Sequence, residues 1–142
     1  MSRLIKLRAW DTVRKVMAPI AYLNFGDEGL ALTTTLKTAP KDIYDDERVA
    51  GESAILMQLI GLTDLRKKDV YEGDIITFRC EGCLRVHRAE IVWMDDLLCW
   101  GMNTDDGQHV PLFHVDEEKG QLKMMVIEQV IGNRYENPDL LS

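Results

Sequence analysis

The chain has 142 residues, of which 46% are hydrophobic and 29% are charged, and its formal net charge is −7. These values predict one soluble domain, 1–142, with a core of its own, and they exclude wholesale disorder. No apolar run approaches the length of about 20 residues that a membrane helix needs, and the negative net charge disfavours direct nucleic-acid binding, which needs a sustained basic surface.

The first 25 residues predict a β-hairpin. In RLIKLRAWD, residues 3–11, apolar and polar side chains alternate, which is the period of a half-buried strand. DTVRK, residues 11–15, is turn-forming, and VMAPIAYLNF, residues 16–25, predicts the returning strand. Pro19 places that strand at an edge or beside a bulge, because proline cannot donate a ladder hydrogen bond.

Residues 24–52 differ in character from the rest of the chain. LALTTTL, residues 30–36, predicts a short strand. Residues 40–49 predict a helical turn that begins at Pro40 and is capped by Thr38. We expect the segment as a whole to be a loop-rich excursion from the sheet or barrel, of the kind that is functional or mobile.

A strand of nearly continuous apolar character is predicted over residues 54–60, with Gly61 at its end. Glu72 and Gly73 predict a turn, in which Gly73 takes a positive φ just before a strand that starts at Asp74. Further strands are predicted within residues 84–94, 96–102, 109–115 and 121–133, before a helical turn or tail at 137–142. The pattern predicts a mainly β fold: a small SH3-like or partly open barrel with an added N-terminal hairpin and little helix.

RCEGCLRVH, residues 79–87, holds two of the three cysteines. Cys80 and Cys83 have the spacing of half a zinc site, and His109 and His114 could supply the other half, although the gap between the two pairs exceeds the common finger spacing. A reactive thiol pair usually has its first cysteine at a helix N-terminus, whereas this one follows a strand. We therefore predict no cofactor and no metal, with these four residues as the alternative zinc ligands.

The same stretch predicts the tip of a hairpin. If residues 80–82 form a three-residue loop, Phe78 lies opposite Leu84 and Ile76 lies opposite Val86, so that apolar side chains pair on one face. Past His87 the apolar residues of the returning strand fall at odd positions, Ala89, Ile91 and Trp93, instead of even ones, which predicts a bulge near His87 and Arg88.

No pattern of catalytic residues is evident. The sequence has no nucleophile elbow, phosphate loop or dinucleotide fingerprint, so we predict that the protein is not an enzyme. Neither Asp95–Asp96 nor Asp105–Asp106 predicts an acid–base dyad, because adjacent residues on a strand point to opposite faces. The second pair, with Gly107, predicts a hairpin turn. The three tryptophans are expected to pack rather than to anchor a partner.

Four stretches together resemble the phage and prophage proteins of the YopX family. They are IKLRAWD near the start, then LMQLIGLTD, VYEGDII and the terminal VIGNRYENPDLL, in this order. The residues of this chain that carry the resemblance are Trp10, Asp11, Gly61, Asp64, Tyr71, Glu72, Gly73, Asp74, Gly132, Asn133 and Tyr135. The resemblance implies a mainly β domain with a small barrel core, and it carries over no activity, substrate or catalytic residue.

The charges segregate along the chain. Residues 1–23 hold five basic residues and one acidic residue, whereas residues 94–142 hold three basic and ten acidic ones. Such polarity favours head-to-tail contact between copies, or a basic partner. We therefore predict a binding or self-assembly module in the bacterial cytoplasm, where three reduced cysteines are expected: a homo-oligomer with a possible protein partner. The alternatives are an acidic decoy or modulator of a host nucleic-acid-handling protein, and a zinc-binding module.

Overall fold

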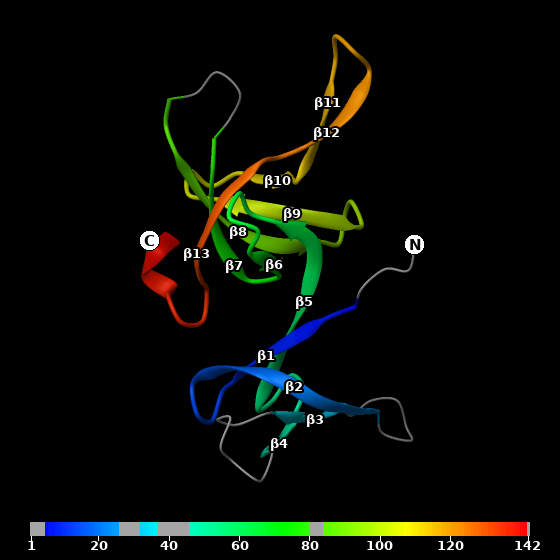
Figure 1. The fold of residues 1–142 in the computed structure, drawn as a ribbon, viewed down its shortest axis with the longest axis vertical. Coiled ribbons are helices and arrows are strands. Elements are labelled where there is room, and N and C mark those ends of the chain that lie inside the picture. Colours follow the sequence, from blue (N-terminus) through cyan, green and yellow to red (C-terminus); the bar gives the residue numbers. More distant parts are fainter. Residues whose placement is uncertain (1–4, 26–31, 37–45, 80–83, 142) are drawn as a thin grey trace. The chain divides into compact units, whose positions relative to one another are not determined.

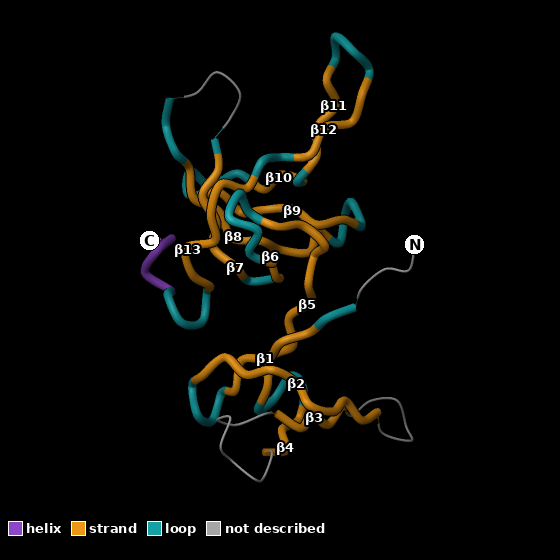
Figure 2. Tube along the Cα trace, viewed as in Figure 1, coloured by secondary structure: helices purple, strands orange, loops and turns teal. Residues whose placement is uncertain are grey.

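The computed structural model describes residues 5–25, 32–36, 46–79 and 84–141, and these form a mainly β protein (Figures 1 and 2). The strands are β1 (Leu7–Asp11), β2 (Val16–Phe25), β3 (Leu32–Leu36), β4 (Asp46–Val49), β5 (Ala54–Thr63), β6 (Asp69–Tyr71), β7 (Asp74–Phe78), β8 (His87–Met94), β9 (Cys99–Thr104), β10 (His109–Pro111), β11 (Phe113–Asp116), β12 (Gln121–Met124) and β13 (Ile127–Asn133). A 3₁₀ helix, η1 (Pro138–Leu141), follows them. The predicted fold class, with little helix, is confirmed. The described residues include no helix with the length and apolar character that crossing a bilayer requires.

The chain divides into two compact units, residues 1–59 and 60–142, each with its own cluster of buried side chains. Hydrogen bonding places the strands in the orders β4-β3-β2-β1-β5-β6, β10-β9-β8-β7-β13 and β11-β12. The second order forms a curled, partly open barrel sheet, as the sequence predicts.

The predicted N-terminal hairpin is confirmed in the first unit. β1 and β2 pair antiparallel, and Asp11 lies opposite Val16 across a four-residue turn. The cluster of buried side chains in this unit consists of small residues, Ala9, Ala18 and Ala54, and Met57 and Leu59 on β5 are buried as well. β2 lies between β1 and β3, and the β2–β3 register shifts just after Pro19, so the proline lies beside an irregularity rather than on an outer strand.

Residues 24–52 contribute two strands to this unit. β3 confirms the strand predicted within residues 30–36, whereas the predicted helical turn is wrong over Asp46–Val49, which form β4. β4 pairs antiparallel with β3. Because β3 offers an unpaired edge, residues 46–49 gain more hydrogen bonds as a strand than as an isolated helical turn. The start of that turn, including Thr38 and Pro40, lies outside the described residues.

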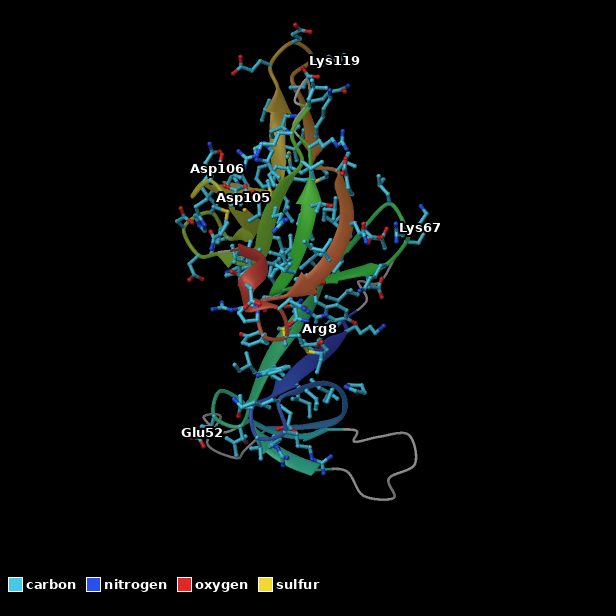
Figure 3. All side chains as sticks on the ribbon, turned by 90° about the vertical axis from the view of Figure 1, so that its left-hand side faces the viewer. Arg8, Glu52, Lys67, Asp105, Asp106 and Lys119 are labelled. Atoms are coloured by element: carbon cyan, nitrogen blue, oxygen red, sulfur yellow. The ribbon has the colours of Figure 1, made fainter. Side chains whose placement is uncertain are left out.

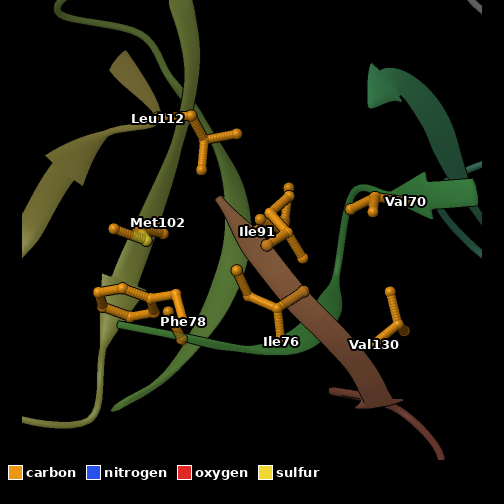
Figure 4. Close-up of a cluster of buried hydrophobic side chains, with 9 residues drawn as sticks. Val70, Ile76, Phe78, Ile91, Met102, Leu112 and Val130 are labelled. Atoms are coloured by element: carbon orange, nitrogen blue, oxygen red, sulfur yellow. The ribbon is translucent and has the colours of Figure 1, made fainter. Parts of the chain in front are cut away.

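The core of the second unit lies on one face of the β10-β9-β8-β7-β13 sheet (Figure 4). Its buried members are Val70, Ile76, Phe78, Ala89, Ile91, Met102, Leu112, Ile127 and Val130. Ile60 and Leu62 from β5 pack against it. Burial of a large apolar side chain stabilises a fold by about 1.5–3 kcal/mol, so these residues dominate the stability of the unit.

Gly61 does not end its strand, which corrects the prediction for this residue. It has a φ of 89°, yet β5 continues to Thr63. Glycine takes a positive φ without steric cost, so the strand continues past Gly61. The turn at Glu72 and Gly73 is confirmed, with a φ of 83° at Gly73.

The register predicted for the β7–β8 hairpin is wrong. Phe78 lies opposite His87 and Ile76 lies opposite Ala89, without the predicted bulge. Leu84 is 95% exposed and takes no part in the ladder. Burial of Ala89 and Ile91, both fully inaccessible, fixes which residues of the returning strand face the core. The apolar alternation therefore shifts along the sequence because the connection between β7 and β8 is longer than three residues. Residues 80–83 of this connection lie outside the described ones.

Two predicted strands each divide in two. Residues 109–115 form β10 and β11, separated by Leu112, and residues 121–133 form β12 and β13. Leu112 is 1% exposed, so insertion of its side chain into the core turns the chain out of the sheet. The backbone N–H of Met125 donates to the carbonyl of Leu112 at 2.6 Å and closes the base of a separate hairpin, β11–β12, which projects beyond the five-stranded sheet in Figure 1.

Candidate functional site

The residues that carry the family resemblance gather at two places. In the second unit, Asp74 lies directly opposite Asn133 on β7 and β13, and the N–H of Arg134 donates to the carbonyl of Gly73 at 2.9 Å. Gly61 and Asp64 belong to the same unit, whereas Trp10 and Asp11 lie on β1 of the first. The structure therefore joins two motifs that are about 60 residues apart in the chain.

Asp64 ties the β5–β6 connection to β13. Its side chain is 3% exposed, and its Oδ1 accepts hydrogen bonds from the N–H groups of Arg66 and Lys68 at 2.8 and 2.9 Å. Its Oδ2 accepts from the N–H of Val130 at 3.0 Å. Burial alone would raise the pKa of Asp64, but these hydrogen bonds outweigh it and hold the pKa below the usual 3.8.

Asp74 and Asn133 act in the same way at neighbouring turns. Asp74 is 1% exposed and accepts from the N–H of Tyr71 at 2.8 Å, which closes the turn around Gly73. Asn133 accepts from the N–H groups of the second and third residues after it, at 3.0 and 2.9 Å. A Cβ at Gly132 would lie 2.8 Å from Cγ of Asn137, so that motif glycine is required for close packing.

Tyr135 and Trp10 complete the motif by packing. Burial raises the pKa of Tyr135, and the guanidinium of Arg134 lies over its ring, 5.4 Å from the centroid. Trp10 is half-buried on β1, between Met17 and Ile55 on the neighbouring strands.

Asp11 organises the β1–β2 turn. It is 2% exposed, and its Oδ1 accepts from the N–H groups of Val13 and Arg14 at 3.0 and 3.1 Å. The Nε of Arg48, on β4, donates to the same oxygen at 3.0 Å. Burial would raise the pKa of Asp11, and the hydrogen bonds from Arg48 and the turn lower it below 3.8.

Four of the motif side chains, those of Asp11, Asp64, Asp74 and Asn133, share one role, which is to accept backbone hydrogen bonds at turns. A carboxylate that is buried, hydrogen-bonded and lowered in pKa is a poor proton acceptor, so Asp11 and Asp64 are unsuited to general-base chemistry. The resemblance therefore identifies residues that build the fold.

The predicted zinc ligands do not form a cluster among the described residues, where no group of three or more histidine, cysteine or acidic side chains could hold a metal ion. His109 is on β10, with Nδ1 against Oδ1 of Asn103. His114 is on β11, opposite Lys123. Cys80 and Cys83 lie outside the described residues, so the zinc alternative stays a prediction.

The two aspartate pairs lie in exposed turns. Residues 105–108 join β9 to β10, and Gly107 has a φ of 85°, which confirms the predicted hairpin turn (Figure 3). Asp105 contacts Arg85 at 3.3 Å and Nδ1 of His87 at 3.5 Å. Asp95 and Asp96 lie in the β8–β9 turn. Asp95 and Asp96 face no second group suited to acid–base chemistry among the described residues. The contact of Asp105 with His87 is shared with Arg85, so it is accounted for as an ion pair that holds the turn.

The most distinctive surface is one face of the β11–β12 hairpin. Val115 lies directly opposite Leu122, and Phe113 lies opposite Met124. Since side chains two apart on a strand share a face, these four form one continuous apolar face, which we call the hairpin face. Three of its members are strongly exposed, Val115 at 57%, Leu122 at 64% and Met124 at 49%, and Phe113 at the base is half-buried.

The opposite face and the tip of this hairpin are polar. His114 and Asp116 on β11 lie opposite Lys123 and Gln121 on β12, and the Nζ of Lys123 is 2.8 Å from Oδ2 of Asp116. The connecting turn carries Lys119 at the tip of the hairpin (Figure 3). The hairpin is thus amphipathic, with its apolar side turned to solvent.

Sequence reasoning missed this hairpin because each of its strands was assigned to a longer one. The signal was present: FHVD and QLKM alternate apolar and polar residues, and the EEKG between them is a turn sequence that ends in glycine. Pro111, one residue before Leu112, also marks an interruption of the preceding strand.

Comparisons with other proteins concern the whole chain. The sequence model of the YopX family, described as YopX protein, matches residues 6–142. The crystal structure of protein EF1440 from Enterococcus faecalis is 25% identical, covers 99% of this chain and 100% of its own, and has a TM-score of 0.58. The structure of protein YopX from Bacillus subtilis is 19% identical, with 96% and 97% covered and a TM-score of 0.57. No curated protein matches the chain.

Proposed function

The chain belongs to the YopX family, and on this premise we propose that it is a non-enzymatic binding module that self-associates, encoded by a phage or prophage and acting in the cytoplasm of a bacterial host. The observation that carries the proposal is the exposed hairpin face, formed by Phe113, Val115, Leu122 and Met124. The family motif supports it indirectly, because its carboxylates are engaged in holding turns.

Association would stabilise a hairpin that is weak by itself. Two-stranded sheets are marginally stable in water, and β11–β12 is a separate two-stranded sheet among the described residues. Its base is held to the core through Leu112 and Met125. Covering the hairpin face would remove several exposed apolar side chains from water, which is the main driving force of association.

A second copy is the occupant that fits this face best. The face is apolar throughout, and its charged residues lie at the tip and on the opposite side. Two identical hairpins can therefore meet face to face about a two-fold axis without burying a charge. The outer edges of both strands also remain available for pairing with a further strand.

Replacing Leu122 by aspartate should weaken self-association by at least tenfold, because a charge would be buried at the centre of the contact. Leu122 is 64% exposed, so the folded chain should lose little stability. Leu65→Asp is the matched control, since Leu65 is 66% exposed in a turn outside the hairpin face. Sedimentation velocity across a concentration series measures the effect. Equal association of wild type and Leu122→Asp would contradict the proposal.

A second candidate function is an acidic decoy of a host nucleic-acid-handling protein. Its support is that eight of the ten acidic residues after Met94 are exposed. The test is capture of DNA-binding proteins from nuclease-treated bacterial lysate, repeated with Glu117→Lys and Glu118→Lys. Salt-sensitive capture that these changes abolish would favour the decoy, and capture of the same proteins by the variant would count against it.

A further inference from the structure

Three hairpins of this protein have the same kind of loop. β1–β2, β8–β9 and β11–β12 are each joined by four residues, and the last residue of each loop has a positive φ. In β11–β12 that residue is Gly120, with a φ of 61°. In the other two it is Lys15, with a φ of 58°, and Leu98, with a φ of 52°.

Leu98 is an unexpected residue at such a position. The left-handed region is unfavourable for a side chain with a Cβ, and glycine or asparagine is the ordinary choice. Leu98 is also 74% exposed, so burial in this chain does not offset the cost of its conformation. The four-residue loop sets the positive φ at this position, so the feature to explain is the residue type: a leucine is presented to solvent where glycine would suit the backbone.

The surroundings of Leu98 form an apolar patch at the end of the β8–β9 hairpin. Leu97 is 53% exposed and Trp93 is 42% exposed. Trp93 is held by edge-to-face packing on Trp100, with ring centroids 5.1 Å apart. Asp95 and Asp96 are exposed in the same turn. We call residues 95–98 the leucine turn.

The β1–β2 turn has the complementary chemistry. Val13 is 66% exposed and Val16 is 47% exposed, and Arg14 and Lys15 between them are exposed as well. We call residues 13–16 the basic turn. Each turn therefore presents two apolar side chains and two charges, and the charges of the two turns are of opposite sign.

We propose that the leucine turn of one copy binds the basic turn of a second copy. The inference rests on the proposed self-association and assigns it a second contact, distinct from the hairpin face. Valine and leucine side chains would pack at the centre of the contact, and the two basic groups would lie against Asp95 and Asp96. Because the two surfaces differ, the contact is head-to-tail and repeats from copy to copy.

A contact between two four-residue turns is small, and small interfaces belong to the weak class. Its charges are solvent-exposed, so its strength should fall as salt is added. Reversal of the charges on one turn should weaken it by about tenfold, since two exposed ion pairs become two repulsive contacts.

Two reciprocal variants test the proposal, both in the Leu122→Asp background so that the hairpin face does not contribute. The first carries Asp95→Lys and Asp96→Lys, and the second carries Arg14→Glu and Lys15→Glu. Each alone should associate about tenfold more weakly than its parent. An equimolar mixture should regain association, because opposite charges again meet at every contact. Sedimentation velocity at low and high salt is the readout.

Leu98→Gly supplies a test that does not depend on charge. Glycine suits the positive φ, so the variant should unfold at the same temperature as its parent or a higher one, while its self-association weakens. Loss of association together with a lower unfolding temperature would instead assign Leu98 a role in folding and overturn the inference.

The remaining outcomes are also decisive. If the mixture is no more associated than each variant alone, the leucine-turn contact is overturned. The proposed association through the hairpin face is still supported in that case, provided that Leu122→Asp weakens association in the wild-type background. A single chain that carries all four charge reversals is the last comparison. If it regains association and the mixture does not, the two turns contact each other within one chain, and the proposed contact between copies is overturned.

Discussion

Replacing Asp64 by alanine is expected to lower the free energy of unfolding of the second unit by about 3 kcal/mol. Three backbone N–H groups lose their acceptor, those of Arg66, Lys68 and Val130. The first two belong to an exposed turn and can bond water, whereas Val130 is 7% exposed in the core. The unsatisfied donor on β13 therefore accounts for most of the loss.

Urea unfolding measures this change, followed by the circular dichroism of the Trp93–Trp100 pair, which reports on the second unit alone. Asp64→Asn should lose less than Asp64→Ala, because the amide oxygen still accepts hydrogen bonds. Asp96→Ala is the control, since it removes an exposed carboxylate and should change stability by no more than about 0.5 kcal/mol. A loss below 1 kcal/mol for Asp64→Ala would show that the tie to β13 is not needed.

The pH dependence provides a second readout of the same carboxylate. The pKa of Asp64 is lower in the folded chain than its usual 3.8, so ionised Asp64 favours folding. Its contribution is complete above the unfolded pKa and is lost as the pH falls below 3.8 through the folded pKa. Asp64→Asn should therefore flatten the decline of stability in acid, in addition to lowering stability at neutral pH.

The parts of the fold that the sequence predicts best are those in which local pattern and tertiary packing agree. VMAPIAYLNF forms β2 with the predicted bounds, and the turn at Gly73 has the predicted φ, because alternation and turn chemistry act over a few residues. Where packing opposes the local pattern, prediction fails. Leu112 interrupts an apparently continuous strand, since the core gains more from its side chain than the ladder loses.

The candidate site was harder to predict than the fold. The resemblance to the YopX family directed attention to buried residues such as Asp64 and Asp74, whose roles depend on hydrogen bonds that no sequence pattern displays. The hairpin face and the leucine turn depend on exposure, which follows from the tertiary arrangement. Leu98 shows the difficulty well, because DDLL alone does not indicate that its last residue has a positive φ.

Replacing Asp11 by alanine should destabilise the first unit by about 3–5 kcal/mol, the usual effect of removing one partner from a buried ion pair. Arg48, whose side chain is 14% exposed, would lose its carboxylate, and the N–H groups of Val13 and Arg14 would lose their acceptor. Hydrogen exchange of peptides from residues 5–25 measures the effect within this unit.

The matched variant is Arg48→Met, which should cost less, because Asp11 keeps the hydrogen bonds of the turn. In the double variant, Asp11→Ala with Arg48→Met, the loss should be smaller than the sum of the two single losses. Strict additivity would contradict coupling between the carboxylate and the guanidinium. Asp11 also fixes the shape of the basic turn, so Asp11→Asn, which retains an acceptor oxygen, should preserve self-association better than Asp11→Ala. This family-motif aspartate would then link the folding of β1–β2 and β4 to the surface through which copies meet.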